Sequence, residues 1–201
     1  MPDASIGGHD TGGFYGERDW EMYVRWTQFT AFSASLRVHS QRDENLDRRP
    51  WRWGETAEEA MKCVYHMRSL LIPYIYSSAY EAYEQGLPPI RGMYIEFPNE
   101  ENAYKFQTQY MFGDSFIVSP ITESGEGENK ITAKKVWIRG GTYYNVFSNE
   151  KYEDGSIAEI KSDINTFPLF VKGGMPIPMQ PYSKRMTSET LKTLIMRIYP
   201  G

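Results

Sequence analysis

The hydrophobic pattern of the first fifty residues predicts one helix, a short strand and a loop. In residues 17–31 apolar and aromatic positions fall roughly on one helical face, and Asp19 stands where an N-cap residue is expected. Residues 35–39 form a short run that fits the end of a strand. Residues 41–54 are polar, rich in Arg and Asp, and interrupted by Pro50. That composition indicates a loop.

The clearest helical pattern covers residues 56–85, where apolar positions recur at steps of three or four. Thr56 followed by Glu59 has the spacing of a capping box, and Gly86 is the expected C-terminal glycine. Pro73 lies inside this segment and lacks the N–H that a helix interior needs. We therefore expect the helix to kink or split one or two residues before it.

The next apolar segment, residues 90–97, is bounded by prolines and reads as a strand buried on both faces. Glu96 would then be a buried carboxylate that needs a partner, and the expected one is Arg91 or an arginine of the barrel. A helix, a loop, a long helix and a strand in succession indicate α/β units.

The pattern changes after residue 98. Short strand-like runs separated by glycine-rich turns follow one another, at residues 116–120, 135–138, 142–147 and 167–171. This spacing predicts an antiparallel β-sandwich that needs no helix. Residues 182–201 begin polar and end in another strand-like run at 194–199.

Composition narrows the possible partners. The net charge of −4 and the pI of about 5.5 give no basic face for nucleic acid, so no nucleic-acid partner is expected. No apolar run is long enough to span a membrane, and no secretory signal is visible in the first ten residues. The single cysteine, Cys63, excludes an internal disulfide and fits a reducing compartment without requiring one. The localisation stays open, and the lack of a visible signal favours the cytoplasm. The composition carries no information on oligomeric state.

Aromatic residues make up 15% of the chain. They fit an aromatic core with high sheet propensity, and they equally fit rings that stack on sugars. Composition does not choose between the two.

Polar residues gather at two places that suit a ligand pocket. Residues 8–14 place Asp10 among glycines, which let a backbone approach a ligand closely. Arg37 and His39 end the short strand, where the tip of a barrel strand would aim them into a pocket.

In the order in which they occur, nine parts of the chain resemble the C-terminal part of family 31 glycoside hydrolases. They are residues 8–14 (GHDTGGF, with Thr11 where the family usually has Ile), 25–28, 37–40, 49–51, 70–76, 91–98 as the eighth barrel strand, and three sandwich motifs at 111–114, 118–121 and 168–174. The fold class implied is α/β plus all-β: the last strands and helices of a partial (β/α)8 or TIM barrel, followed by an antiparallel β-sandwich. The domains expected are 1–98 as barrel, 99–182 as proximal sandwich and 183–201 as the start of a distal β domain.

The resemblance implies a retaining, exo-acting α-glycosidase that releases terminal α-linked glucose or xylose from an oligosaccharide or other α-glycoside, without cofactor or metal. Retaining enzymes use two carboxylates about 5 Å apart. The family carries them as aspartates on earlier barrel strands, and no position here matches either motif. We therefore expect this chain to be a fragment that is inactive alone.

Four residues form the expected sugar subsite by the same resemblance. His39 would donate a hydrogen bond to a hydroxyl of the non-reducing sugar, and Asp10 would shape the pocket rather than attack the sugar. Arg37 would fix the carboxylates or the strand end. Phe14 would wall the pocket. Without the resemblance these residues read as a structural histidine, an ordinary ion pair and a core ring.

Several alternatives stay open at this level. Ser5 could take the position given to Asp10 if the glycine-rich turn is aligned differently; the distance to Arg25 and the following Phe14 favour Asp10. A non-catalytic carbohydrate-binding or interaction module would place the function in the sandwich, and a homologue that has lost catalysis is a third hypothesis. His66 is expected to be structural, residues 48–53 to be a solvated loop, and the histidines and cysteine lack metal-site spacing.

Overall fold

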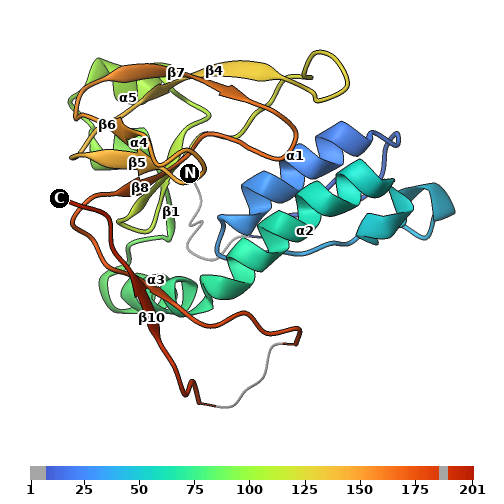
Figure 1. Ribbon diagram of the computed structural model, residues 1–201, viewed down its shortest axis with the longest axis horizontal. Coiled ribbons are helices and arrows are strands. Elements are labelled where there is room, and N and C mark those ends of the chain that lie inside the picture. Colours follow the sequence, from blue (N-terminus) through green and yellow to red (C-terminus); the bar gives the residue numbers. More distant parts are fainter. Residues whose placement is uncertain (1–7, 186–189) are drawn as a thin grey trace.

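The computed structural model describes residues 8–185 and 190–201, so Ser5 and the alternative alignment of the turn lie outside the described residues. The first half of the chain is helical (Figure 1). Its elements are α1 (Trp20–Ala31), the 3-10 turns Glu44–Leu46 and Pro50–Arg52, α2 (Glu55–Leu70) and α3 (Ile72–Gln85). None of the helices among the described residues is both long and apolar enough to cross a membrane.

Helices α1 and α2 lie side by side (Figure 1) and share a small core. The prediction for α1 is confirmed, because the Asp19 carboxylate accepts a hydrogen bond from the Met22 N–H at 3.0 Å. The capping box predicted for α2 is wrong. The helix begins one residue earlier, at Glu55. Gly54, with φ of 97°, takes the N-cap position, and no side chain makes a capping hydrogen bond there.

The long helix splits where proline requires it. Leu71 separates α2 from α3, with Pro73 in the first turn of α3, and Gly86 ends α3 in the left-handed conformation at φ 72°. Arg68, near the end of α2, donates hydrogen bonds to the carbonyls of Ala31 (2.8 Å) and Ser33 (2.6 Å). A half-buried guanidinium therefore satisfies carbonyls at the end of α1 and ties the two helices together.

The second half of the chain is an antiparallel sandwich, as predicted. One sheet has six strands in the order β1-β2-β3-β8-β5-β6, and a two-stranded sheet, β4–β7, packs over it. Every pairing is antiparallel, and the register of the central pair sets Phe116 opposite Val171. The strands are β1 (Ile90–Gly92), β2 (Tyr110–Phe112), β3 (Phe116–Val118), β4 (Thr132–Trp137), β5 (Tyr143–Asn145), β6 (Lys151–Tyr152), β7 (Ile157–Ser162) and β8 (Leu169–Lys172).

The eight-residue strand predicted over residues 90–97 is wrong. Only β1 is extended, and it joins the sandwich sheet by pairing with β2; the chain then turns into the short helix α4 (Met93–Glu96). The turn brings Glu96 back onto Arg91, which also pairs with Asp114 at 2.6 Å. The predicted ion pair is confirmed, and forming it requires the chain to leave the extended conformation.

The structure adds one short helix to the predicted elements and shortens the last predicted strand. The sandwich region contains one short helix, α5 (Glu101–Lys105), where no helix was expected. The run at 194–199 forms β10 (Ile195–Arg197), which pairs with β9 (Ile177–Met179), and Tyr199 stacks on Tyr144 at 5.3 Å between ring centroids. The boundaries at residues 98 and 182 remain predictions.

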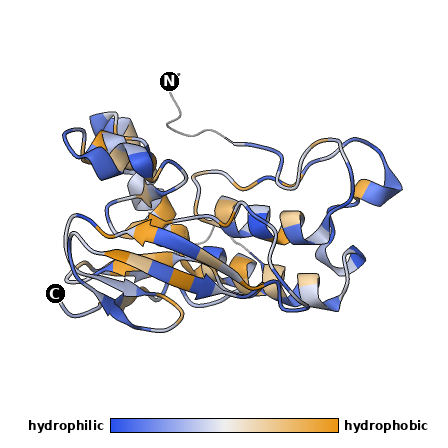
Figure 2. Cartoon of the chain, turned by 90° about the horizontal axis from the view of Figure 1, so that it is seen from above, coloured by the Kyte–Doolittle hydropathy of each residue, from blue (hydrophilic) through white to orange (hydrophobic). Residues whose placement is uncertain are grey.

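The core follows the hydrophobic pattern of the strands. Figure 2 shows hydrophobic stretches in the strands and hydrophilic residues in most connecting loops. The larger cluster lies between one face of the six-stranded sheet and the helices, and includes Phe32, Phe112 and Phe116. A second cluster, with Trp137 and Phe170, lies between the two sheets. Burial of these aromatic side chains is the main driving force for the fold.

Two side chains of α1 hold the helical half to the sandwich. Arg25 donates from Nη1 to the carbonyls of Asp163 (2.8 Å) and Thr166 (3.0 Å), and from Nη2 to that of Lys130 (2.9 Å). Gln28 donates to the carbonyl of Ile164 at 2.7 Å. Arg25 is buried, which lowers its pKa. These bonds fix the relative position of the strand ends described next and the sandwich.

Candidate functional site

Two backbone segments meet in parallel at the candidate site. Asp10 and Arg37 form a parallel bridge, and the Thr11 N–H donates to the Arg37 carbonyl at 2.9 Å. Further along, the Gln41 N–H donates to the Phe14 carbonyl at 2.8 Å. This is the arrangement that two neighbouring parallel strand ends of a barrel would have. The strand predicted at residues 35–39 is therefore reduced to a single bridge in the structure.

The side chains at the bridge form an ion pair. An Nη2 of Arg37 lies 2.5 Å from an Asp10 carboxylate oxygen, and the Asp10 side chain is 18% exposed whereas that of Arg37 is 60% exposed. The pairing fixes the carboxylate at the edge of the turn. The guanidinium retains open donors toward solvent, which a sugar hydroxyl could accept.

His39 and Phe14 lie next to each other beyond this pair, with ring centroids 5.3 Å apart. Both are exposed. His39 lines a hollow of about 840 Å³ whose other walls come from residues 40–50 and Tyr65. Of the four predicted subsite residues only His39 lines the hollow, while Asp10, Arg37 and Phe14 lie along the two segments that lead to it. The structure thus brings the four together, and their roles in sugar binding stay predictions.

Arg48 holds the glycine-rich turn in place. It is 7% exposed, and its Nη2 donates to the carbonyls of Gly12 and Gly13, both at 2.6 Å. Its guanidinium lies over the rings of Tyr23 (5.1 Å) and Trp53 (5.3 Å). Burial lowers the pKa of Arg48. The expectation of a solvated loop over residues 48–53 is wrong for Arg48 and Trp53, because both are buried against α1 and the turn.

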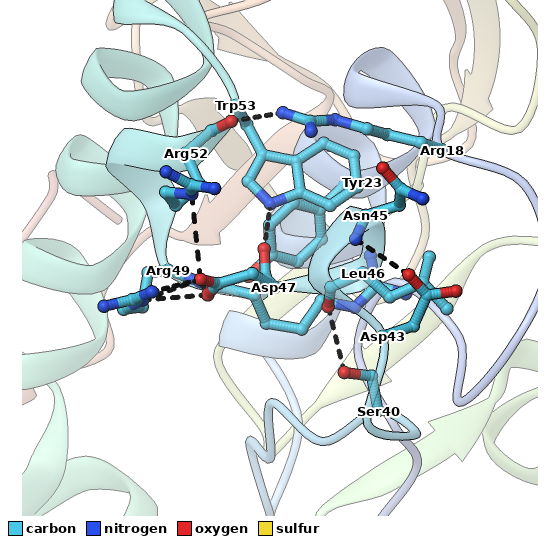
Figure 3. A network of polar contacts seen from close by, with 11 residues as sticks. Arg18, Tyr23, Ser40, Asp43, Asn45, Leu46, Asp47, Arg49, Arg52 and Trp53 are labelled. Atoms are coloured by element: carbon cyan, nitrogen blue, oxygen red, sulfur yellow. Dashed lines mark hydrogen bonds and ion pairs between the residues drawn. The ribbon is translucent and has the colours of Figure 1, made fainter.

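A network of polar contacts fixes the loop after His39 (Figure 3). The Trp53 indole N–H donates to the Asp47 carbonyl at 2.5 Å, and the Asp47 carboxylate pairs with Arg49. Ser40 donates to the Leu46 carbonyl at 2.9 Å. The contact with Arg49 lowers the pKa of Asp47 to about 2, so this carboxylate is ionised over the whole physiological range. The wall of the hollow is therefore fixed by its own hydrogen bonds.

His9, immediately before Asp10, faces the helix instead of the hollow. Its ring contacts Phe29 edge-on at 4.9 Å and Trp26 at 5.8 Å. Burial lowers the pKa of His9, with opposing contributions from Asp10, which raises it, and Arg37, which lowers it further. The neutral ring acts as a support for the turn.

Reasoning from sequence missed Arg48, Tyr23 and Trp53 as parts of the site. Arginines in a polar, proline-containing loop usually lie in solvent, and nothing local distinguishes Arg48 from Arg49. The only available signal was the pair of aromatic residues that could cover a cation. His66 contacts the Tyr182 ring at 4.3 Å, away from the hollow. No group of side chains with the composition of a metal site occurs among the described residues.

Comparison with known proteins gives the family. The model of the glycosyl hydrolases family 31 TIM-barrel domain matches residues 3–78, and that of the family 31 C-terminal domain matches residues 86–177. The chain belongs to glycosyl hydrolase family 31. The order of the two domains agrees with the resemblance of the individual motifs, and the fold class of a partial barrel followed by a sandwich is confirmed.

Individual family 31 relatives agree with this assignment. The chain is 32% identical to an alpha-xylosidase of Saccharolobus solfataricus over 96% of its own length and 26% of the relative's. It is 32% identical to human neutral alpha-glucosidase C over 88% of its length and 19% of the relative's. A family 31 dextranase of Flavobacterium johnsoniae, solved in complex with isomaltotriose, superimposes with a TM-score of 0.85 at 30% identity, covering 96% of this chain and 24% of that one. The chain thus spans about a quarter or less of these relatives.

Proposed function

We propose that this chain supplies part of the sugar subsite of a retaining α-glycosidase that releases terminal α-linked glucose or xylose. The observation that carries the proposal is the parallel Asp10–Arg37 bridge with His39 two residues beyond it at the hollow. A fixed carboxylate and a guanidinium on the segments that lead to the hollow, with an imidazole in its wall, offer both acceptors and donors to the hydroxyls of a sugar. Membership in a family of glycoside hydrolases supports the reaction class.

The mechanism follows from what these side chains can do. His39 donates a hydrogen bond to a hydroxyl of the non-reducing sugar, and such a bond that strengthens as charge develops lowers the barrier to departure of the leaving group. Asp10 accepts a hydrogen bond from a neighbouring hydroxyl, and the ion pair with Arg37 holds its carboxylate in orientation. The nucleophile and the general acid come from other parts of the enzyme. The isolated chain is inactive for that reason.

A chimera tests this proposal. The aligned quarter of the Saccharolobus solfataricus alpha-xylosidase is replaced by residues 1–201, and kcat/KM is measured for p-nitrophenyl α-xyloside and α-glucoside. We expect activity with retention of the anomeric configuration, and a loss of at least about tenfold in kcat/KM for His39→Ala, the value of one lost hydrogen bond.

His66→Ala is the matched control, because it removes the same side chain at a place away from the hollow. Thermal unfolding of each chimera separates a fold defect from a site defect. Equal kcat/KM for the two alanine variants, or a product of inverted configuration, contradicts the proposal. Turnover of either aryl glycoside by the 201-residue chain alone contradicts its inactivity.

A further inference from the structure

A second hollow, of about 550 Å³, opens at the edge of the sandwich, where the β5–β6 hairpin faces β7. We call it the sandwich hollow; its lining includes Phe147, Glu150, Tyr152, Glu159, Thr166 and Phe167. None of the lining residues is shared with the hollow beside His39. Its volume lies in the range of small-molecule sites, roughly 300–1,000 Å³.

Aromatic rings in fixed orientations form part of its walls. Phe147 meets Phe167 edge-on with centroids 5.3 Å apart, and Tyr152 meets Phe170 edge-on at the same distance. Phe147 and Tyr152 are each only partly buried. Partly exposed rings held by packing offer apolar faces to the C–H side of a pyranose at little cost in side-chain entropy.

Glu150 provides an oriented acceptor beside these rings. One of its oxygens, Oε2, accepts hydrogen bonds from the Tyr152 hydroxyl (3.0 Å) and from Ser148 Oγ (3.2 Å). Burial, with the nearby Glu150, raises the pKa of Tyr152 to about 12, so the hydroxyl stays a donor. Within the part of the chain that the structure describes, the other oxygen has no hydrogen-bond partner. The carboxylate is thus fixed while half of its acceptor capacity is free.

Strand β7 adds further polar groups on the opposite side. Glu159 and Lys161 alternate with the inward-facing Ile160 along the strand, and both are exposed. No hydrogen bond or ion pair engages the Glu159 carboxylate among the described residues. The hollow therefore combines ring faces with two carboxylates and one ammonium group.

The groups that line the sandwich hollow indicate which class of ligand fits it. Two carboxylates disfavour an anion, and no side-chain group suited to a metal occurs among the described residues. A saccharide presents several hydroxyl donors around an apolar ring face, which matches fixed carboxylate acceptors next to aromatic walls. We propose that the sandwich hollow is a second, non-catalytic binding site for a saccharide, and isomaltotriose is the probe. The inference does not rest on the proposed function of the His39 rim.

The test is a titration of the ¹⁵N-labelled 201-residue chain with isomaltotriose, followed by amide chemical shifts. We expect shifts concentrated in residues 145–152 and 159–167, with a dissociation constant on the order of 1 mM, typical of a shallow site. Glu150→Gln replaces a charged acceptor by a neutral one and is expected to weaken binding about tenfold. The side chain is exposed, so the fold should be retained, which thermal unfolding checks.

Two controls make the result specific. Glu128→Gln removes the same charge from an exposed position outside the hollow and should leave the affinity unchanged. His66→Ala, which changes a histidine that lines neither hollow, should also leave it unchanged. The inference is overturned by an absence of shifts at the hollow, by shifts confined to the surroundings of His39, or by equal affinity of the Glu150→Gln variant and wild type.

Discussion

Replacing Arg48 by methionine removes the guanidinium that clamps the glycine-rich turn and keeps an apolar stem of similar length. The structure shows which interactions the variant loses. Two hydrogen bonds at 2.6 Å to the carbonyls of Gly12 and Gly13 are lost, at about 1.5–3 kcal/mol each, together with the contacts over the Tyr23 and Trp53 rings.

In the wild type, the cost of burying Arg48 offsets part of the stabilisation that these interactions give. Burying the guanidinium costs solvation free energy, and Nε and Nη1 of Arg48 have no hydrogen-bond partner within the described ranges. We therefore expect a net loss of about 2–4 kcal/mol in the free energy of unfolding for Arg48→Met. The neighbouring Arg49 is exposed, and Arg49→Met is the matched control that should leave stability close to wild type.

The assay is urea denaturation followed by tryptophan fluorescence, to which Trp53 contributes directly as the ring under Arg48. Amide spectra of Gly12 and Gly13 should broaden in the Arg48→Met variant, because the carbonyls of the turn lose the donor that holds them. A loss below about 0.5 kcal/mol, or equal losses for Arg48→Met and Arg49→Met, would refute the clamp.

Three further predictions concern the turn, the sandwich contact and pH. Gly12→Ala should cost at least about 1–3 kcal/mol, because φ is +84° and a Cβ would lie 2.6 Å from Tyr23 Cδ2, whereas Gly127→Ala (φ +67°, nothing near) should cost less; thermal unfolding compares them. Arg25→Ala should lower the free energy of unfolding by about 3–5 kcal/mol in urea denaturation, because three carbonyls lose the guanidinium that donates to them. Arg18 is an exposed arginine near the start of the same helix, and Arg18→Ala should change the free energy of unfolding little. Burial lowers the pKa of Lys134 from 10.5 to about 8, so the native state binds fewer protons than the unfolded state between these values. The free energy of unfolding should therefore rise with pH from about 8 until tyrosines ionise near 10. Lys134→Met should remove this rise, and an unchanged pH dependence in the variant would contradict the prediction.

Local signals predicted the elements whose causes are local. Asp19 caps α1, Gly86 ends α3 and Pro73 splits the long helix, because each depends on one residue's own geometry or hydrogen-bonding capacity. The Thr56–Glu59 pair shows the limit of this reasoning: the motif is present, but the helix begins at Glu55 with Gly54 as its N-cap.

Contacts between distant segments were beyond the sequence. Residues 90–97 have the composition of a strand, yet pairing of Arg91 with both Glu96 and Asp114 bends the chain after three residues. Arg48 has the same neighbours in sequence as any loop arginine, and only the fold brings Gly12, Gly13 and two rings around it. The four candidate subsite residues were singled out because family motifs mark their positions, and their roles stay predictions. The groups that hold the glycine-rich turn in place, such as Arg48, were not predicted.

The most direct test of the account is a crystal structure of the chimera described above, soaked with xylose or glucose. The account predicts a sugar at the rim formed by Asp10, Arg37 and His39, with an imidazole nitrogen of His39 within about 3.2 Å of a sugar hydroxyl. A sugar bound in the barrel with His39 turned away from it, and with no contact to Asp10 or Arg37, would contradict the claim that this chain supplies part of the subsite.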